Sequence, residues 1–264
     1  MLLKRLIVAA LILPLLYAYI MYLPDYYFLI LMFFAAFICM DEFLCMYGVK
    51  ELPRRVFSVL GLIPLYMTYE YNEIPAYVFA AMFMGCEVIR LFDRKGPDNA
   101  LFDIAPFLAG LFYIPVSLSY FIKLRAIAPE VVLFLMFVIW GADSAALYIG
   151  KAVGRRKLYE RVSPNKTVEG AVAALIGGAA SAVILKIGFK FQIAYMTTIA
   201  VGIVLGVLGI IGDLIESMFK RDRNIKDSGS FLPGHGGILD KVDGMLIAAP
   251  VLYYLILLVN IHYE

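Results

Sequence analysis

Apolar runs of membrane-crossing length recur from one end of this chain to the other. We identify them near residues 6–22, 26–47, 56–71, 74–91, 100–122, 129–150, 168–187, 191–216 and 242–261. A helix needs about 20 apolar residues to cross the hydrocarbon core of a bilayer, where its own hydrogen bonds satisfy the backbone. Since the 264 residues are 63% hydrophobic and only 17% charged, the sequence predicts an all-α polytopic membrane protein with about nine transmembrane helices in a single integral membrane domain, 1–264.

The basic residues are distributed unequally between the two sides that nine spans define. Of the 23 lysine and arginine residues, 19 fall on the side of the N-terminus. The other side carries only Lys123, Arg125, Lys186 and Lys190. Because lysine and arginine accumulate in cytoplasmic loops, the pattern predicts a cytoplasmic N-terminus, a C-terminus outside, and two long cytoplasmic loops at 151–167 and 217–241.

Four acidic residues occur at the two ends of the polar segment 212–243. Asp213 and Glu216 are three residues apart near the end of the eighth predicted span, and Asp240 and Asp243 have the same spacing at the start of the ninth. Residues three apart share a helix face. A carboxylate at this depth costs roughly 3 kcal/mol, which favours a bound partner over simple anchoring of the helix end in the headgroup layer.

A glycine-rich turn, Gly234-His235-Gly236-Gly237, leads into the ninth predicted span. Glycines allow close backbone approach, and free N–H groups at a helix start attract phosphate. Acids beside a phosphate would repel it unless a divalent cation such as Mg²⁺ lay between them. We therefore expect metal-assisted phosphate chemistry, with Lys220, Arg221 and Lys226 holding phosphates. His235 could be a base, a loop brace or, as we favour, a hydrogen-bond donor to phosphate.

A second polar region surrounds the loop 151–167. Asp143 lies in an otherwise apolar span, which again indicates a partner. In the turn 163–170, Lys166 suits a phosphate or nucleotide contact, whereas Thr167 either caps the following helix or joins the site. The basic run 155–157 is typical of a surface for lipid headgroups. Four further acids either line the same cavity or pair with Arg90 and Arg94, and their roles stay open: Asp41, Glu42, Glu87 and Asp103.

The polar segment carries a long pattern of fixed spacings: Ser217-x-Phe219-Lys220-Arg221-x4-Lys226-Asp227-x-Gly229-x2-Leu232-Pro233-x-His235-Gly236-Gly237-Ile238-x-Asp240-Lys241-Val242-Asp243. It resembles the signature of the phosphatidate cytidylyltransferase (CDP-diacylglycerol synthase) family. Trp140-Gly-Ala-Asp143, the run 163–170 and the run 212–217 are similar to the same family, whereas the first 130 residues resemble it only in being hydrophobic. One departure is Lys241, where the family usually has arginine, so that a point charge replaces bidentate geometry.

The resemblance implies a membrane enzyme of phospholipid biosynthesis. Its reaction joins CTP and phosphatidic acid to give CDP-diacylglycerol and pyrophosphate, by direct attack of the lipid phosphate on the α-phosphorus, with Mg²⁺ offsetting the charge. A second cation is left open. The resemblance further implies a homodimer in the bacterial inner membrane, with membrane lipids but no nucleic acid as partners and an active site near the cytoplasmic face.

These expectations assign roles to individual residues. Residues 1–128 are expected to form the N-terminal spans, and residues 129–264 the catalytic half. The expected metal ligands are Asp213, Asp240 and Asp243. The residues expected to act in catalysis are these three acids with Lys220, Arg221, Lys226 and His235. The residues expected to bind the substrates are Asp143, Ser163, Lys166, Thr167, Glu169, Ser217, Asp227, Gly236, Gly237 and Lys241.

Two alternatives remain at this level. A cytidylyltransferase for an archaeal-type ether lipid phosphate would need the same machinery. A secondary transporter of an anionic solute could use buried aspartates as ion sites, but transporters usually have paired repeats and broken helices at the bilayer midplane. The chain shows no evident repeat, and its polar groups gather at one face.

Overall fold

The computed structural model describes residues 13–92, 96–229, 231 and 236–258. A short helix, Leu13–Tyr22, comes first. The helices of the N-terminal half are α2 (Asp25–Met46), α3 (Glu51–Leu60), α4 (Ile63–Tyr71), α5 (Ala76–Phe92), α6 (Ala100–Leu111), the π-helix η1 (Phe112–Val116) and α7 (Ser117–Ile127). Those of the C-terminal half are α8 (Pro129–Val153), α9 (Val168–Phe189), α10 (Tyr195–Asp222) and α11 (Leu239–Leu258).

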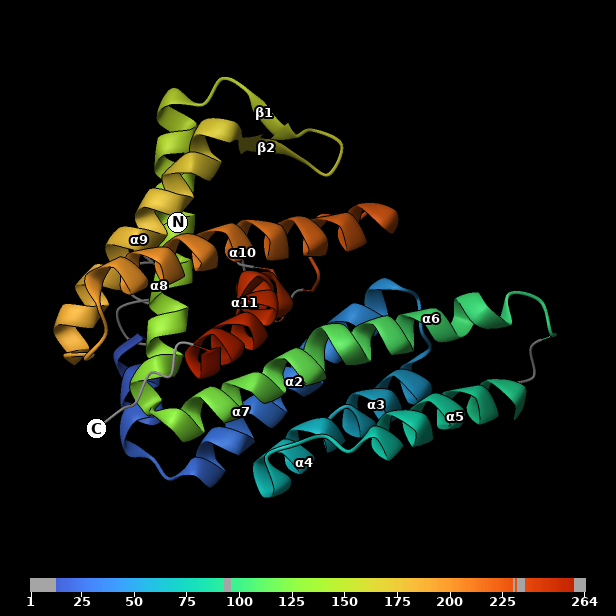
Figure 1. Cartoon of the computed structure of the whole chain (residues 1–264). Coiled ribbons are helices and arrows are strands. Elements are labelled where there is room, and N and C mark those ends of the chain that lie inside the picture. Colours follow the sequence, from blue (N-terminus) through green and yellow to red (C-terminus); the bar gives the residue numbers. More distant parts are fainter. Residues whose placement is uncertain (1–12, 93–95, 230, 232–235, 259–264) are drawn as a thin grey trace.

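Six of the described helical segments are long and apolar enough to cross a membrane, which confirms an all-α membrane protein. They are α2, the continuous segment Ala100–Ile127, α8, α9, α10 and α11 (Figure 1). The predicted spans near 56–71 and 74–91 correspond to shorter helices. The first is divided between α3 and α4, because Pro64 lies at the start of α4, where its missing N–H is tolerated. The second is α5, which has 17 residues.

Small residues let α10 approach both α9 and α11 closely. A Cβ on Gly202 of α10 would lie 2.6 Å from the carbonyl oxygen of Gly178 in α9. Farther along α10, a Cβ on Gly212 would lie 2.5 Å from the carbonyl oxygen of Asp243 and 2.6 Å from Cα of Gly244 in α11. Glycine permits this backbone-to-backbone packing between membrane helices. The contact at Gly212 brings the neighbouring Asp213 beside Asp243.

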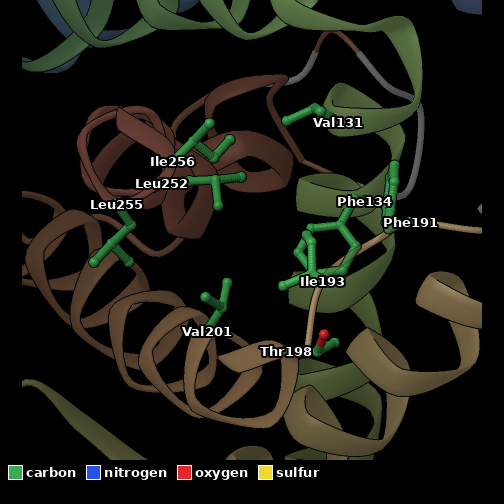
Figure 2. Close-up of a pocket in the computed structure, with 9 residues that line it drawn as sticks. All are labelled: Val131, Phe134, Phe191, Ile193, Thr198, Val201, Leu252, Leu255 and Ile256. Atoms are coloured by element: carbon green, nitrogen blue, oxygen red, sulfur yellow. The ribbon is translucent and has the colours of Figure 1, made fainter. Parts of the chain in front are cut away.

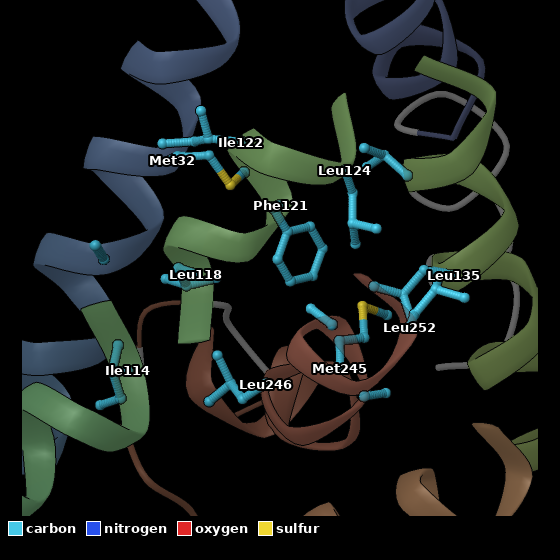
Figure 3. Packing of buried hydrophobic residues seen from close by; sticks show 14 of the residues in the cluster. Met32, Ile114, Leu118, Phe121, Ile122, Leu124, Leu135, Met245, Leu246 and Leu252 are labelled. Atoms are coloured by element: carbon cyan, nitrogen blue, oxygen red, sulfur yellow. The ribbon is translucent and has the colours of Figure 1, made fainter. Parts of the chain in front are cut away.

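The buried core joins helices from both halves of the chain. Figure 3 shows Met32 of α2 with Leu118 and Phe121 of α7, facing Met245 and Leu246 of α11. All five side chains are buried, none more than 8% exposed. The packing of α2 and α7 against α11 therefore fixes the N-terminal half relative to the polar segment that precedes α11.

A β-hairpin, which the sequence analysis did not anticipate, connects α8 to α9. Its strands are β1 (Lys157–Tyr159) and β2 (Ser163–Thr167), which pair antiparallel with Lys157 opposite Thr167. Figure 1 shows the hairpin extending from the adjacent ends of α8 and α9. It ends where the Thr167 hydroxyl accepts a hydrogen bond from the Gly170 N–H and caps α9.

Candidate functional site

Three acidic side chains converge where α10 lies against α11. Asp213, Glu216 and Asp243 each offer a carboxylate oxygen, and these oxygens all lie within 4.8 Å of one another. Oxygens on opposite sides of an octahedral Mg²⁺ are roughly 4.2 Å apart, twice the usual Mg–O distance. In addition, Oε1 of Glu216 is buried and has no hydrogen-bond partner among the described residues. The residues therefore fit a hard divalent cation.

Asp240 has a different environment from these three acids. Its Oδ1 lies 2.7 Å from Nζ of Lys220, and its Oδ2 accepts hydrogen bonds from the Gly237 N–H at 2.8 Å and the Ser228 hydroxyl at 2.9 Å. Both oxygens are thus engaged within the protein. The set of three converging acids contains Glu216, which the sequence analysis paired with Asp213 on one helix face but did not assign to the metal.

Lys220 lies between two acids rather than facing solvent. Its buried ammonium group is 2.6 Å from Glu216 Oε2 and 2.7 Å from Asp240 Oδ1. The Glu216 contact follows from their spacing of one helical turn on α10, whereas the Asp240 contact crosses to α11. Lys220 therefore neutralises part of the acidic cluster and joins the two helices that form it.

The hairpin delivers a second lysine to the same acids. Nζ of Lys166, on β2, is 2.5 Å from Oδ2 of Asp213. The Ser217 hydroxyl donates to Oδ1 of Asp213 at 3.2 Å. Asp143, on α8, is within electrostatic range of both Asp213 and Lys166. The two polar regions singled out in the sequence thus meet at Asp213.

Several of the other predicted residues brace the surrounding loops. The Arg221 guanidinium donates to the carbonyl oxygens of Val162 and Ile225, at 3.3 Å and 2.7 Å, and so connects α10 to the hairpin. Glu169 accepts hydrogen bonds from the N–H groups of Arg155 and Arg156, which holds the end of α8 against the start of α9. Three of the predicted site residues, Arg221, Glu169 and Thr167, therefore stabilise the loops and helix ends around the site.

The remaining predicted residues lie in β2, in the loop before α11 or in the first turn of α11. Lys226, Asp227 and Lys241 are exposed, and Ser163 is half-buried at the start of β2. Gly236 has φ +85°, in the left-handed region that favours glycine. His235 lies outside the described residues.

Glu42, whose role is open at the level of the sequence, makes specific contacts in the structure. Although it belongs to α2, its carboxyl group accepts hydrogen bonds from the N–H groups of Ile238 and Leu239, at 3.1 Å and 3.0 Å. No sequence spacing could connect residues so far apart. Two of the other open acids form ion pairs, Asp41 with Arg54 at 2.9 Å and Asp103 with Arg90 at 2.8 Å.

A half-buried tyrosine also lies within electrostatic range of the acids, and no signal in the sequence marked it. Tyr113, on the π-helix η1, packs against the rings of Phe43 and Phe219, with centroids 6.3 Å and 5.5 Å away. Its hydroxyl is buried and has no hydrogen-bond partner among the described residues. Asp243 and Glu216 are among the charged groups that act on it. In the sequence, Tyr113 was one of 18 tyrosines in mostly apolar spans.

An apolar pocket lies away from the acidic cluster. Figure 2 shows Val131 and Phe134 of α8 facing Val201 of α10 and Leu252 of α11. Along α8, these two residues are roughly 14–18 Å from Asp143 at 1.5 Å per residue. The polar side chain that lines the pocket is Thr198, whose hydroxyl donates to the carbonyl of Ala194 at 3.1 Å. This pocket therefore offers no groups for phosphate chemistry.

The chain is similar to proteins of known family. The model of a family described as the cytidylyltransferase family matches residues 3–259. A phosphatidate cytidylyltransferase of Staphylococcus saprophyticus is 33% identical over 238 residues, which cover 87% of this chain and 90% of the relative. A protein of the same name from Bacillus subtilis is 40% identical over 149 residues, 55% of each chain. Another, from Staphylococcus haemolyticus, is 31% identical over 233 residues, 86% of this chain and 90% of the relative.

Proposed function

The chain belongs to the cytidylyltransferase family, and we propose that it transfers the cytidylyl group of CTP to phosphatidic acid. The products are CDP-diacylglycerol and pyrophosphate, and the reaction belongs to phospholipid biosynthesis. The observation that carries the proposal is the convergence of Asp213, Glu216 and Asp243 within 4.8 Å, at the contact between two helices of membrane-spanning length. Such a site can serve a phosphate that is attached to a lipid.

Asp213, Glu216 and Asp243 would hold Mg²⁺, which when bound would offset the negative charge of the reacting phosphates. Two of these acids, Asp213 and Asp243, were expected as ligands from the sequence. We replace the third expected ligand, Asp240, with Glu216, because Glu216 and not Asp240 belongs to the three acids whose oxygens lie within 4.8 Å of one another. In addition, Oε1 of Glu216 has no hydrogen-bond partner among the described residues.

The side chains around these acids would bind and orient the substrates. An oxygen of the lipid phosphate attacks the α-phosphorus of CTP, a new P–O bond forms, and the bond from the α-phosphorus to the bridging oxygen of pyrophosphate breaks. No protein nucleophile is required. Lys166 beside Asp213, Arg221 in the last turn of α10 and Lys226 in the following loop would offset charge on the phosphates. Lys220 would hold Glu216 and Asp240 in place.

The activity can be tested directly with purified protein. Labelled CTP and phosphatidic acid should give a labelled CDP-lipid when Mg²⁺ is present and none when it is chelated. An ether-linked lipid phosphate, offered in place of phosphatidic acid, would distinguish the archaeal-type alternative. If neither lipid is labelled by a folded protein, the proposed function is wrong.

We further propose that nine spans cross the bacterial inner membrane, with the N-terminus and the site on the cytoplasmic side and with two copies of the chain in a homodimer. The orientation is supported by the 19 of 23 basic residues on that side. It agrees with the availability of CTP in the cytoplasm. The dimer follows from the family resemblance and is open to a mass measurement in detergent.

The orientation predicts which loops react from outside an intact cell. In a cysteine-free background, Asn165→Cys in β2 and Asp222→Cys at the end of α10 should resist a membrane-impermeant thiol reagent until the membrane is permeabilised. Gln192→Cys, exposed in the loop between α9 and α10, is the matched control and should react at once. Labelling of positions 165 and 222 from outside would reverse the topology and contradict access of cytoplasmic CTP.

A further inference from the structure

An acid from the N-terminal half contacts the polar segment that leads into α11. Glu42 lies one turn from the C-terminal end of α2, and the residue is only 7% exposed. Its carboxyl oxygens accept hydrogen bonds from the N–H groups of Ile238 and Leu239, at 3.1 Å and 3.0 Å. The Ser228 hydroxyl lies 3.4 Å from the same group. Glu42 thus contacts the loop that precedes α11 at Ser228 as well as the start of α11.

The two N–H groups are ones that α11 cannot satisfy by itself. The first N–H groups of a helix have no acceptor one turn earlier, and α11 begins at Leu239. A side chain of α2 supplies the acceptor in place of a capping residue on the same helix. Asp240 and Asp243 follow within the next turn, so the position of both acids depends on this contact.

The surrounding glycines leave just enough room for the Glu42 side chain. A Cβ on Gly229 would lie 2.5 Å from Oε1 and 2.8 Å from Cδ of Glu42, and one on Gly237 would collide with Oε2. Contacts below 3.0 Å require something to move. The carboxyl group therefore fits only because both neighbours in the loop are glycines.

We propose that Glu42 is a positioning residue for the acidic cluster: by holding the first turn of α11 and Ser228, it sets Asp240 and Asp243 relative to Asp213 and Glu216 on α10. Ser228 extends the effect, since its hydroxyl also donates to Asp240 at 2.9 Å. Glu42 touches neither substrate nor metal in this assignment. The inference rests on the proposed function, because it concerns the geometry of that same site.

Glu42→Gln tests the proposal because it keeps the shape of the side chain but turns one acceptor into a donor. That donor would face an N–H group of α11, so at least one hydrogen bond is lost. We expect amide exchange in the peptide 236–246 to quicken about tenfold in the metal-free protein. We also expect the Mg²⁺ concentration for half-maximal turnover to rise about tenfold, with the helical content unchanged. Asp41→Asn, which removes the neighbouring acid that pairs with Arg54, should change neither quantity.

Gly229→Ala provides a second, independent variant. The added methyl group would collide with the Glu42 carboxyl group. We therefore expect faster amide exchange in the peptide 236–246 and a higher Mg²⁺ concentration for half-maximal turnover, as in Glu42→Gln. Gly188→Ala, at a glycine with nothing within 4 Å of an added Cβ, is its control.

If amide exchange in the peptide 236–246 of Glu42→Gln proceeds at the wild-type rate, the proposal is wrong. It would equally be overturned if exchange quickened but the Mg²⁺ requirement stayed the same, since the acids would then not depend on the contact. A wild-type protein that makes no CDP-lipid would refute the proposed function alone. The exchange experiment needs no activity and would still show whether Glu42 holds α11.

Discussion

Asp213→Asn is expected to lower turnover at least about a hundredfold, near 2.7 kcal/mol in the activation free energy. Asparagine keeps the shape of the side chain but removes the charge that a divalent cation requires, and it breaks the 2.5 Å ion pair with Lys166. Asp243→Asn should have a similar effect, because its carboxylate belongs to the same cluster. The measurement is turnover as a function of Mg²⁺ concentration, on detergent-purified protein of intact size.

Asp222→Asn is the matched control for this prediction. Asp222 is exposed at the end of the same helix, α10, so its variant should behave almost like the wild type. If Asp213→Asn keeps normal turnover and a normal Mg²⁺ response, the metal site lies elsewhere and the proposed mechanism fails.

Turnover as a function of Mg²⁺ concentration also distinguishes the two roles considered for Asp240, as a metal ligand or as a partner that orients Lys220. If Asp240 only orients Lys220, Asp240→Asn should lower turnover while the Mg²⁺ concentration for half-maximal turnover stays near the wild-type value. A Mg²⁺ response as poor as that of Asp213→Asn would return Asp240 to the metal ligands, as the sequence suggested.

Lys220→Met is expected to destabilise the protein as well as inactivate it. The methionine retains most of the side-chain volume but leaves Glu216 and Asp240 without the ammonium group that lies 2.6 Å and 2.7 Å from them. Removing one partner of a buried ion pair costs about 3–5 kcal/mol, because the other charge stays buried and unpaired. The thermal midpoint in detergent should therefore fall by several degrees and turnover should be lost.

Two further variants make this result specific. Lys151→Met, at the exposed end of α8, should leave the thermal midpoint unchanged. Adding Glu216→Gln to Lys220→Met should restore part of the stability, since one unpaired acid is removed, but not the activity. A Lys220→Met protein as stable as the wild type would show that the acids do not need this lysine.

The local arrangement of the site was predictable wherever it depends on helix periodicity. The three-residue spacing of Asp213 and Glu216, and of Asp240 and Asp243, places each pair on one helix face whatever surrounds it. Likewise, the contact between Lys220 and Glu216 requires only one turn of α10. The turn 163–170 was recognised as polar, but its pairing into a hairpin was missed because its strands are short and carry no alternation of apolar residues.

The sequence by itself determined the class of protein and the chemistry of its polar loops. Apolar runs of this length are not compatible with a fold in water and require transmembrane helices in lipid. The signature of charged residues and glycines indicates the family even without a structure. Only the tertiary structure decided which acids converge. Glycine contacts between α10 and α11 bring Asp213 to Asp243, and the packing of α2 against α11 brings Glu42 to Ile238 and Leu239. These contacts depend on how helices that are distant in the sequence pack against one another, and the spacing of residues along the chain does not determine that packing.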